Sequence, residues 1–94
     1  WVKIASISKI SAKNMVHEQG AIPYDDMLPL ARAVIAAAPD RVIWGSDWPH
    51  GNTFKLGTVP NDGALLDFFG AAAPDDATRQ RILVDNPARL FGFA

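Results

Sequence analysis

The most informative part of the sequence is the run Arg41-Val-Ile-Trp-Gly-Ser-Asp-Trp-Pro-His50. Its first half, residues 41–45, is short, apolar and β-prone, a pattern typical of a strand buried in a parallel sheet. Polar side chains follow directly, at Ser46, Asp47 and His50. In parallel α/β folds the functional loops leave the carboxyl ends of the strands. The stretch therefore predicts a buried strand and, after it, a loop suited to a functional site.

A second apolar segment, residues 1–5, predicts another short strand that is buried on both faces. Residues 6–23 are mostly polar and lack a regular period, so they predict a long loop. A helix is expected next, with Asp25 or Asp26 as its N-terminal cap and Pro29 in its first turn. One apolar stripe of this helix is expected to face the core: Met27, Ala31, Val34, Ile35 and Ala38.

This order of strand, helix and strand is a βαβ unit, which builds parallel sheets. Helices are expected after the loop of residues 46–60. Asp62 is expected to cap the first of them, and the apolar side chains expected to be buried there are Leu65, Leu66 and Phe69. Pro74 is expected to begin a second helix that runs to about Asp85.

The last expected element is a short helical turn. Asn86 is predicted to cap it, with Pro87 at the first helical position. Leu90 and Phe91 are the side chains that this turn is expected to bury.

Composition limits the classes of function. The chain has 94 residues, nine basic and ten acidic, for a net charge of -1, and no basic stripe, so a nucleic-acid partner is not expected. No apolar run approaches the roughly 20 residues of a membrane span, and nothing resembles a signal peptide, so we predict a cytoplasmic protein without membrane contact. The absence of cysteine excludes disulfides and thiolate metal sites.

Asp47 is the strongest candidate for a catalytic group. An acid followed three residues later by the imidazole of His50 offers a general base or a metal ligand beside a second polar group. Trp48 could exclude water from the carboxylate, and both Trp48 and His50 are expected to contact a substrate. An aspartate in a loop with proline also commonly forms a turn, so a turn-forming Asp47 stays open as an alternative. For His50 the alternative is a place at the surface or behind the residues that touch the substrate.

The loop after the first strand supplies two further candidates. Lys9 is predicted on the same rim as Asp47, where its charge could hold an anionic substrate group, and Ser6 could bind a ligand or make a turn. With two histidines and no cysteine, the chain cannot complete a tetrahedral zinc site by itself. Neither a glycine-rich phosphate loop nor a serine nucleophile elbow occurs.

Four stretches, in this order along the chain, resemble the amidohydrolase-2 family of TIM-barrel hydrolases. Residues 1–6 resemble its seventh strand, residues 40–50 its eighth, residues 60–66 the helix after the active-site loop, and residues 82–92 its C-terminal signature. The resemblance implies an α/β fold. Residues 1–94 would be the C-terminal part of a single barrel domain, its last two βα units, incomplete alone and dependent on the rest of the barrel or on self-association. The start on an apolar strand without methionine also leads us to expect a fragment, inactive alone.

The subgroup that the chain resembles most is that of the 2-pyrone-4,6-dicarboxylate lactonases. This resemblance implies hydrolysis of a small anionic, lactone-like carboxylate, with Asp47 activating water or binding a divalent metal such as zinc or manganese; a metal-free enzyme is also compatible. It places Lys9 where the family often has a substrate-binding arginine. Ala5-Ser6 departs from the family's serine and glycine. Alternatives are a metal-dependent non-oxidative decarboxylase and a non-catalytic barrel piece that docks with a complementary chain.

Overall fold

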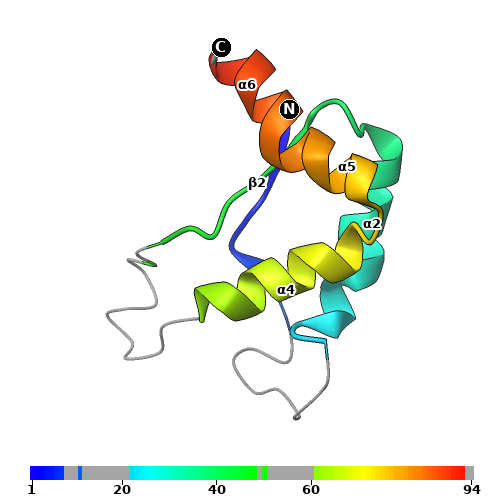
Figure 1. Ribbon diagram of the computed structural model, residues 1–94. Coiled ribbons are helices and arrows are strands. Elements are labelled where there is room, and N and C mark those ends of the chain that lie inside the picture. Colours follow the sequence, from blue (N-terminus) through cyan, green and yellow to red (C-terminus); the bar gives the residue numbers. More distant parts are fainter. Residues whose placement is uncertain (8–10, 12–21, 49, 51–60, 93–94) are drawn as a thin grey trace.

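The computed structural model describes residues 1–7, 11, 22–48, 50 and 61–92 (Figure 1). Its elements are, in chain order, strand β1 (Val2–Ile4), 3-10 turn η1 (Asp25–Met27), helix α2 (Leu28–Ala37), strand β2 (Val42–Trp44), helix α4 (Asp62–Ala72), helix α5 (Asp76–Gln80), π-helical turn η2 (Arg81–Asp85) and helix α6 (Asn86–Phe91).

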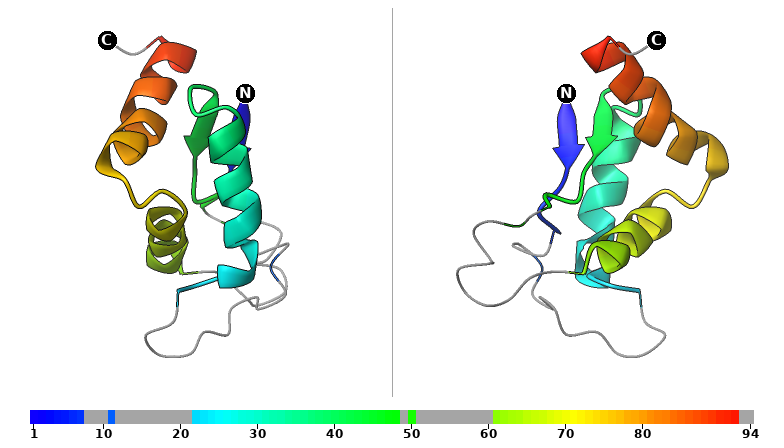
Figure 2. Two further views of the ribbon diagram at one scale, coloured as in Figure 1. Left: turned by 90° about the vertical axis from the view of Figure 1, so that its right-hand side faces the viewer. Right: turned by 60° about the vertical axis from the view of Figure 1, so that its left-hand side comes forward.

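The two strands pair in parallel, as the βαβ pattern predicts. Val2 lies opposite Val42 and Ile4 opposite Trp44, and the Gly45 amide extends the pairing by donating to the Ile4 carbonyl at 3.1 Å. The start of β1 and the end of α6 lie at one end of the molecule, and both strands run away from that end (Figure 2). The loops that follow β1 and β2 therefore start at the same, opposite end.

The sheet is covered on one face by helices. Figure 2 shows α2 crossing this face, with the C-terminal helices beside β2. The buried cluster is formed by Ile4, Ile7, Tyr24, Leu28, Ala31, Ile35, Val42, Leu65, Phe68, Phe69, Ala72, Ala73 and Ile82. Two aromatic contacts join its layers: Tyr24 meets Phe68 edge-on at 6.5 Å between ring centroids, and Trp44 lies 5.9 Å from Phe69. Burial raises the pKa of Tyr24.

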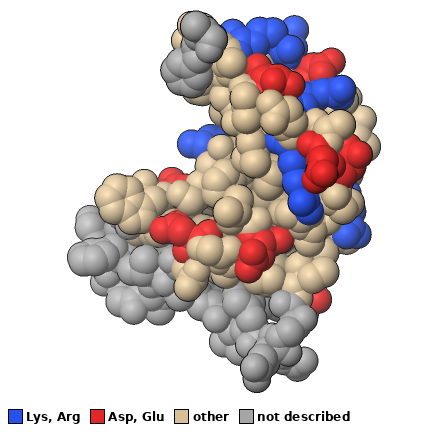
Figure 3. Space-filling model, viewed as in Figure 1, with Lys and Arg blue, Asp and Glu red and all other residues tan. Residues whose placement is uncertain are grey.

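The prediction that β1 is buried on both faces is wrong for this chain. Val2 is 45% exposed and Lys3 is also exposed, so Ile4 is its only buried residue. Among the described residues β1 pairs with β2 alone, which leaves its other edge uncovered. In the view of Figure 3 the surface is hollowed between α6 at the top and the segment after β2 at the lower left.

Helix α2 begins later than the aspartates that were expected to cap it. Asp25 and Asp26 form η1, and no side chain caps either η1 or α2. The 3-10 turn itself brings the chain into the helix, so the expected capping by these residues is wrong. Pro29 does lie in the first turn of α2. Of the expected stripe, Ala31 and Ile35 are buried and Val34 packs against the core, joined by Leu28.

Helix α4 is capped by the residue before the expected one. The Asn61 side chain accepts a hydrogen bond from the Ala64 amide at 3.1 Å, and Asp62 is the first helical residue. Leu65 and Phe69 are buried as expected, but Leu66 is 48% exposed and Phe68 takes its place in the core. The buried residues of α4 follow the 3.6-residue period, and Leu66 lies off that stripe.

The C-terminal segment is one nearly continuous helical run from Asp76 to Phe91. Asp75 caps its start, since its carboxylate accepts hydrogen bonds from the hydroxyl and the amide of Thr78, and these bonds lower the pKa of Asp75. Leu90 and Phe91 are exposed, so their expected burial is wrong for the described residues. No helix in the described part of the chain has both the length and the apolar character needed to cross a bilayer.

Asn86 does not cap a helix. It lies within the helical run, is fully buried, and donates through Nδ2 to the carbonyls of Pro39 and Val42, both at 2.8 Å. Those carbonyls flank the start of β2. Asn86 thus fastens the C-terminal helix to the beginning of the strand that leads to Asp47.

We expect Asn86→Ala to lower the free energy of unfolding by about 2–4 kcal/mol, because two buried carbonyls lose their donor. Urea denaturation followed by tryptophan fluorescence measures this change. Gln80→Ala, at an exposed position of α5, is the control and should change stability by no more than about 0.5 kcal/mol. Equal midpoints for Asn86→Ala and Gln80→Ala would contradict the assignment.

Candidate active site

The carboxyl ends of the two strands bring Ser6 and Asp47 together. The Ser6 hydroxyl donates a hydrogen bond to Asp47 Oδ2 at 3.0 Å, although the two residues are 41 positions apart. Both residues are half-buried. A hydroxyl that donates to a carboxylate oxygen restrains the orientation of that carboxylate. The contact therefore holds an oriented carboxylate at the rim where functional groups gather in parallel α/β folds.

The backbone at this rim is tightly turned. Ser6, Asp47 and His50 have φ angles of 57°, 67° and 60°, in the left-handed region that residues other than glycine seldom adopt. The His50 amide donates to the Asp47 carbonyl at 2.8 Å, which ties the backbones of these two residues together. Such angles persist only where surrounding contacts hold them, and they concentrate at functional sites.

His50 is not a surface residue, which was one of the alternatives that the sequence left open. It is 2% exposed, and its ring nitrogen Nε2 lies 2.7 Å from Oδ1 of Asp62, the first residue of α4. The sequence gives no direct sign of this pairing, because the two residues are 12 positions apart. Only the position of an acid at a helix start points to Asp62.

Lys3 is a charged residue near this rim that the sequence analysis did not single out. It lies on the face of the sheet opposite to Ile4 and extends across Gly45: a Cβ added to Gly45 would stand 2.5 Å from Lys3 Cε and 3.1 Å from Nζ. Gly45 precedes Asp47 by two positions. The alternation of a strand, which turns every second side chain to one face, was the signal that could have found Lys3.

Of the other two predicted site residues, Trp48 is described by the structure and Lys9 is not. Trp48 is 73% exposed, and its amide donates to the Ser46 hydroxyl at 3.2 Å. Its expected role beside a substrate stays a prediction. Lys9 lies outside the described residues, so its assignment to an anionic group also stays a prediction.

Comparison with known proteins gives this rim its context. The sequence matches the amidohydrolase family over residues 1–93. The chain belongs to the amidohydrolase family. The resemblance of the strand and C-terminal motifs to that family is thereby confirmed.

Relatives of this amidohydrolase chain include enzymes named for lactone hydrolysis. It is 48% identical to a 4-sulfomuconolactone hydrolase of Rhizobium radiobacter, over 98% of this chain and 28% of that protein. It is 43% identical to a 2-pyrone-4,6-dicarboxylate hydrolase of Comamonas testosteroni, over 97% of this chain and 30% of that protein. The chain thus spans less than a third of the length of these relatives.

A solved structure shares the arrangement of the amidohydrolase chain. An Agrobacterium tumefaciens protein, solved without ligand, superposes with a TM-score of 0.75 at 34% identity. The match covers 100% of this chain and 30% of that protein. The strands and helices described above therefore form about a third of a larger fold in that relative.

The described residues of this rim do not make up a metal site. Among the residues that the structure describes, no group of three or more histidine and acidic side chains is placed to hold a metal ion. Asp47 carries a carboxylate, a group that zinc and manganese bind, but its Oδ2 accepts a hydrogen bond from the Ser6 hydroxyl. The described residues thus offer one candidate ligand and not a complete site.

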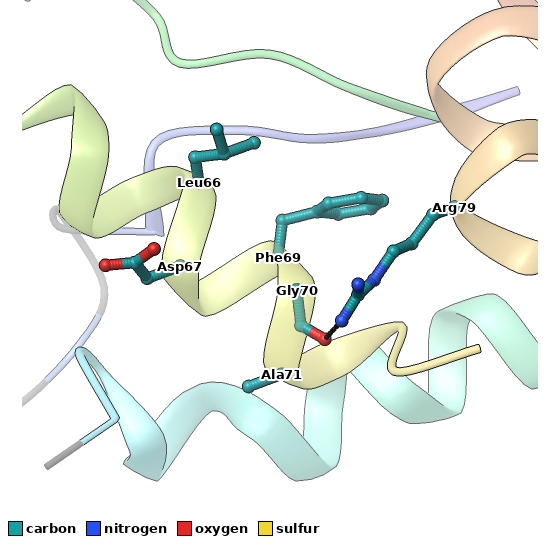
Figure 4. A pocket seen from close by; sticks show the side chains of 6 residues that line it. All are labelled: Leu66, Asp67, Phe69, Gly70, Ala71 and Arg79. Carbon is teal, nitrogen blue, oxygen red and sulfur yellow. Dashed lines mark hydrogen bonds between the residues drawn. The ribbon is translucent and has the colours of Figure 1, made fainter. Parts of the chain in front are cut away.

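A separate cavity of about 500 Å³ lies between α4 and α5 (Figure 4). Its lining residues are Leu66, Asp67, Phe69, Gly70, Ala71 and Arg79. The guanidinium of Arg79 donates to the carbonyls of Gly70 at 2.8 Å and Ala73 at 2.6 Å, near the end of α4. Ser6, Asp47 and His50 do not line this cavity. Its basic residue, Arg79, is used to satisfy carbonyl groups at the end of α4.

The strain at Ser6 leads to a prediction about two substitutions. Ser6→Ala should lower the free energy of unfolding by about 1 kcal/mol, because the hydrogen bond to Asp47 is lost. Ser6→Gly should be close to neutral, because relief of the left-handed backbone, worth about 1 kcal/mol, offsets the same loss. Urea denaturation of both variants tests this. Equal destabilisation by alanine and glycine would show that the backbone at Ser6 carries no strain.

Proposed function

We propose that the intact protein to which this chain belongs hydrolyses the lactone ring of a small anionic carboxylate, with Asp47 as general base. The observation that carries the proposal is the Ser6–Asp47 hydrogen bond of 3.0 Å at the carboxyl ends of two parallel strands. Membership of the amidohydrolase family and the similarity to two lactone hydrolases support it.

The proposed reaction follows from the position of the carboxylate. Asp47 takes a proton from water, and the water oxygen attacks the lactone carbonyl carbon. The carbonyl carbon to ring oxygen bond then breaks, and the proton passes from Asp47 to the departing ring oxygen. The product is an open-chain hydroxy acid or its tautomer. Ser6 keeps the carboxylate oriented, and a positioned base of this kind contributes about 10²–10⁴-fold in rate.

We further propose that β1 and β2 are the last two strands of a TIM barrel that the intact protein completes. The uncovered edge of β1 and the exposed side chains of Trp1 and Val2 fit contact with further strands. If the intact enzyme uses zinc or manganese, Asp47 is the ligand that this chain contributes, and the other ligands come from the rest of the barrel. Metal analysis of the purified intact protein decides between the two cases.

Asp47→Asn in the intact protein should lower kcat for lactone opening by about 10²–10⁴-fold, because the amide cannot accept the proton of water. Ring opening of 2-pyrone-4,6-dicarboxylate and of 4-sulfomuconolactone can be followed spectrophotometrically. Asp85→Asn, which changes an exposed carboxylate of η2, is the matched control and should keep wild-type kcat. A kcat of Asp47→Asn equal to that of Asp85→Asn would refute the role of Asp47.

Lys3 is proposed to hold the anionic group of the substrate. Its side chain passes over Gly45, which has no Cβ to block it, and approaches the end of β2 just before Asp47. An ammonium group on this face attracts a carboxylate or a sulfonate as a point charge. In a closed barrel this face of the strand turns inward, where water screens charges less.

Lys3→Met should raise KM for these substrates by roughly 10-fold or more, since a hydrogen bond to a charged group is lost. Gly45→Ala should raise KM as well, because the new methyl group displaces the flexible end of Lys3 at little steric cost to the fold. Steady-state kinetics of Lys3→Met, Lys9→Met and the control Arg32→Met measure the effect. If KM rises only in Lys9→Met, the anionic group belongs to Lys9 and the assignment to Lys3 is wrong.

A further inference from the structure

His50 joins two parts of the molecule that the chain itself connects only through a long segment. Its ring Nε2 lies 2.7 Å from Asp62 Oδ1, and the His50 side chain is 3% exposed while that of Asp62 is 45% exposed. The buried end of the pair is thus the histidine, and the acid lies at the surface. A hydrogen bond between a ring nitrogen and a carboxylate is one of the stronger contacts available to a histidine.

The Asp62 end of this contact is fixed by the core. Asp62 is the first residue of α4, and α4 is held by the buried side chains of Leu65, Phe68 and Phe69. Asn61 satisfies the Ala64 amide at the same helix end. The backbone that bears the Asp62 side chain therefore has little freedom to move.

The His50 end of the contact leads directly to Asp47. The His50 amide donates to the Asp47 carbonyl at 2.8 Å, and both residues have left-handed backbone angles. Left-handed geometry costs a residue with a side chain about 1–2 kcal/mol, so this backbone geometry relies on its contacts to persist. The buried ring of His50 is such a contact, since it cannot leave its place without opening the bond to Asp62.

We propose that His50 is a positioning residue: its bond to Asp62 maintains the backbone hydrogen bond between His50 and Asp47 and so aims the Asp47 carboxylate at the attacking water. This inference rests on the proposed function. It adds a role for His50 that acts through Asp47 and involves no contact with the substrate. The path runs from α4 through Asp62 and His50 to the backbone of Asp47. Ser6 restrains the carboxylate at its other end.

The same geometry argues against His50 as a residue that touches substrate. Its Nε2 is engaged with Asp62, and the side chain is almost wholly covered. A residue that holds substrate affects KM, whereas one that aims a general base affects kcat. The division between kcat and KM therefore separates the two roles.

Four variants of the intact protein test the proposal. Asp62→Ala removes the acceptor, and Asp62→Asn keeps an oxygen acceptor at the same place. His50→Asn removes the reach to Asp62 but tolerates the left-handed backbone, and His50→Gln keeps a donor near the position of Nε2. Asp67→Ala, an exposed acid farther along α4, is the matched control. The readouts are kcat and KM for opening of 2-pyrone-4,6-dicarboxylate and 4-sulfomuconolactone.

We expect Asp62→Ala and His50→Asn each to lower kcat by about 10- to 100-fold with little change in KM, because a small misplacement of a catalytic group has effects of this size. Asp62→Asn and His50→Gln should recover most of the lost kcat, and Asp67→Ala should match wild type. The double variant Asp62→Ala with His50→Asn should be no slower than either single variant, since both break one contact. If Asp62→Ala does not fold, His50→Asn and its comparison with His50→Gln carry the same test.

Three results would overturn the positioning role. They are wild-type kcat in His50→Asn, a rise in KM with kcat unchanged, and additive losses in the double variant. Asp47→Asn is assayed alongside. If Asp47→Asn is inactive while His50→Asn is normal, only the positioning role is wrong. If Asp47→Asn keeps wild-type kcat, the proposed function itself is wrong.

Discussion

Ile4 and Trp44 lie opposite each other in the parallel pair of β1 and β2, and the Gly45 amide continues that pairing to the last carbonyl of β1. This register places the residues after both strands at one level. Ser6 and Asp47 meet at that level, and Lys3 crosses to Gly45 just below it. A shift of one residue would turn every side chain of β2 to the other face and separate these groups. The chemistry proposed for the rim thus depends on backbone pairing before it depends on any side chain.

Helix α4 connects the core to the same rim. Phe68 and Phe69 anchor it against Tyr24 and Trp44, and its first residue holds the ring of His50. The helix therefore does more than cover the sheet. It gives the loop after β2 a second attachment, which the strand alone could not supply, and this attachment reaches the backbone of Asp47.

The sequence predicted the parts of this structure that depend on local pattern. The two strands, their parallel pairing and the helix between them follow from short apolar runs and from the 3.6-residue stripe that includes Ala31 and Ile35. Choices between neighbours were harder. Asn61 and Asp62 are both residue types that cap helices, and Asn61 is the one that caps α4. Leu66 and Phe68 are both apolar, and Phe68 is the one that is buried. In each case a small difference in where the helix begins or which face it buries decides between the two.

Contacts between distant residues were beyond local pattern. An asparagine before a proline, as at Asn86, is typical of a helix start. Its side chain instead donates hydrogen bonds to two carbonyls more than forty positions earlier in the chain. The partner of His50 could not be read from spacing either, because the intervening chain sets no fixed distance. The catalytic role of Asp47 and the binding roles of Lys9 and Trp48 stay predictions, since geometry alone gives a position and not a reaction.

The attachment of Asn86 has a consequence for how such a protein can change over evolution. It secures β2 at the end remote from Asp47, so this attachment lies at the opposite end of the strand from the left-handed residues Asp47 and His50. Substitutions that reshape the loops for a different substrate then leave the fastening of the strand intact. A family with this arrangement can change its specificity at the rim with little loss of stability.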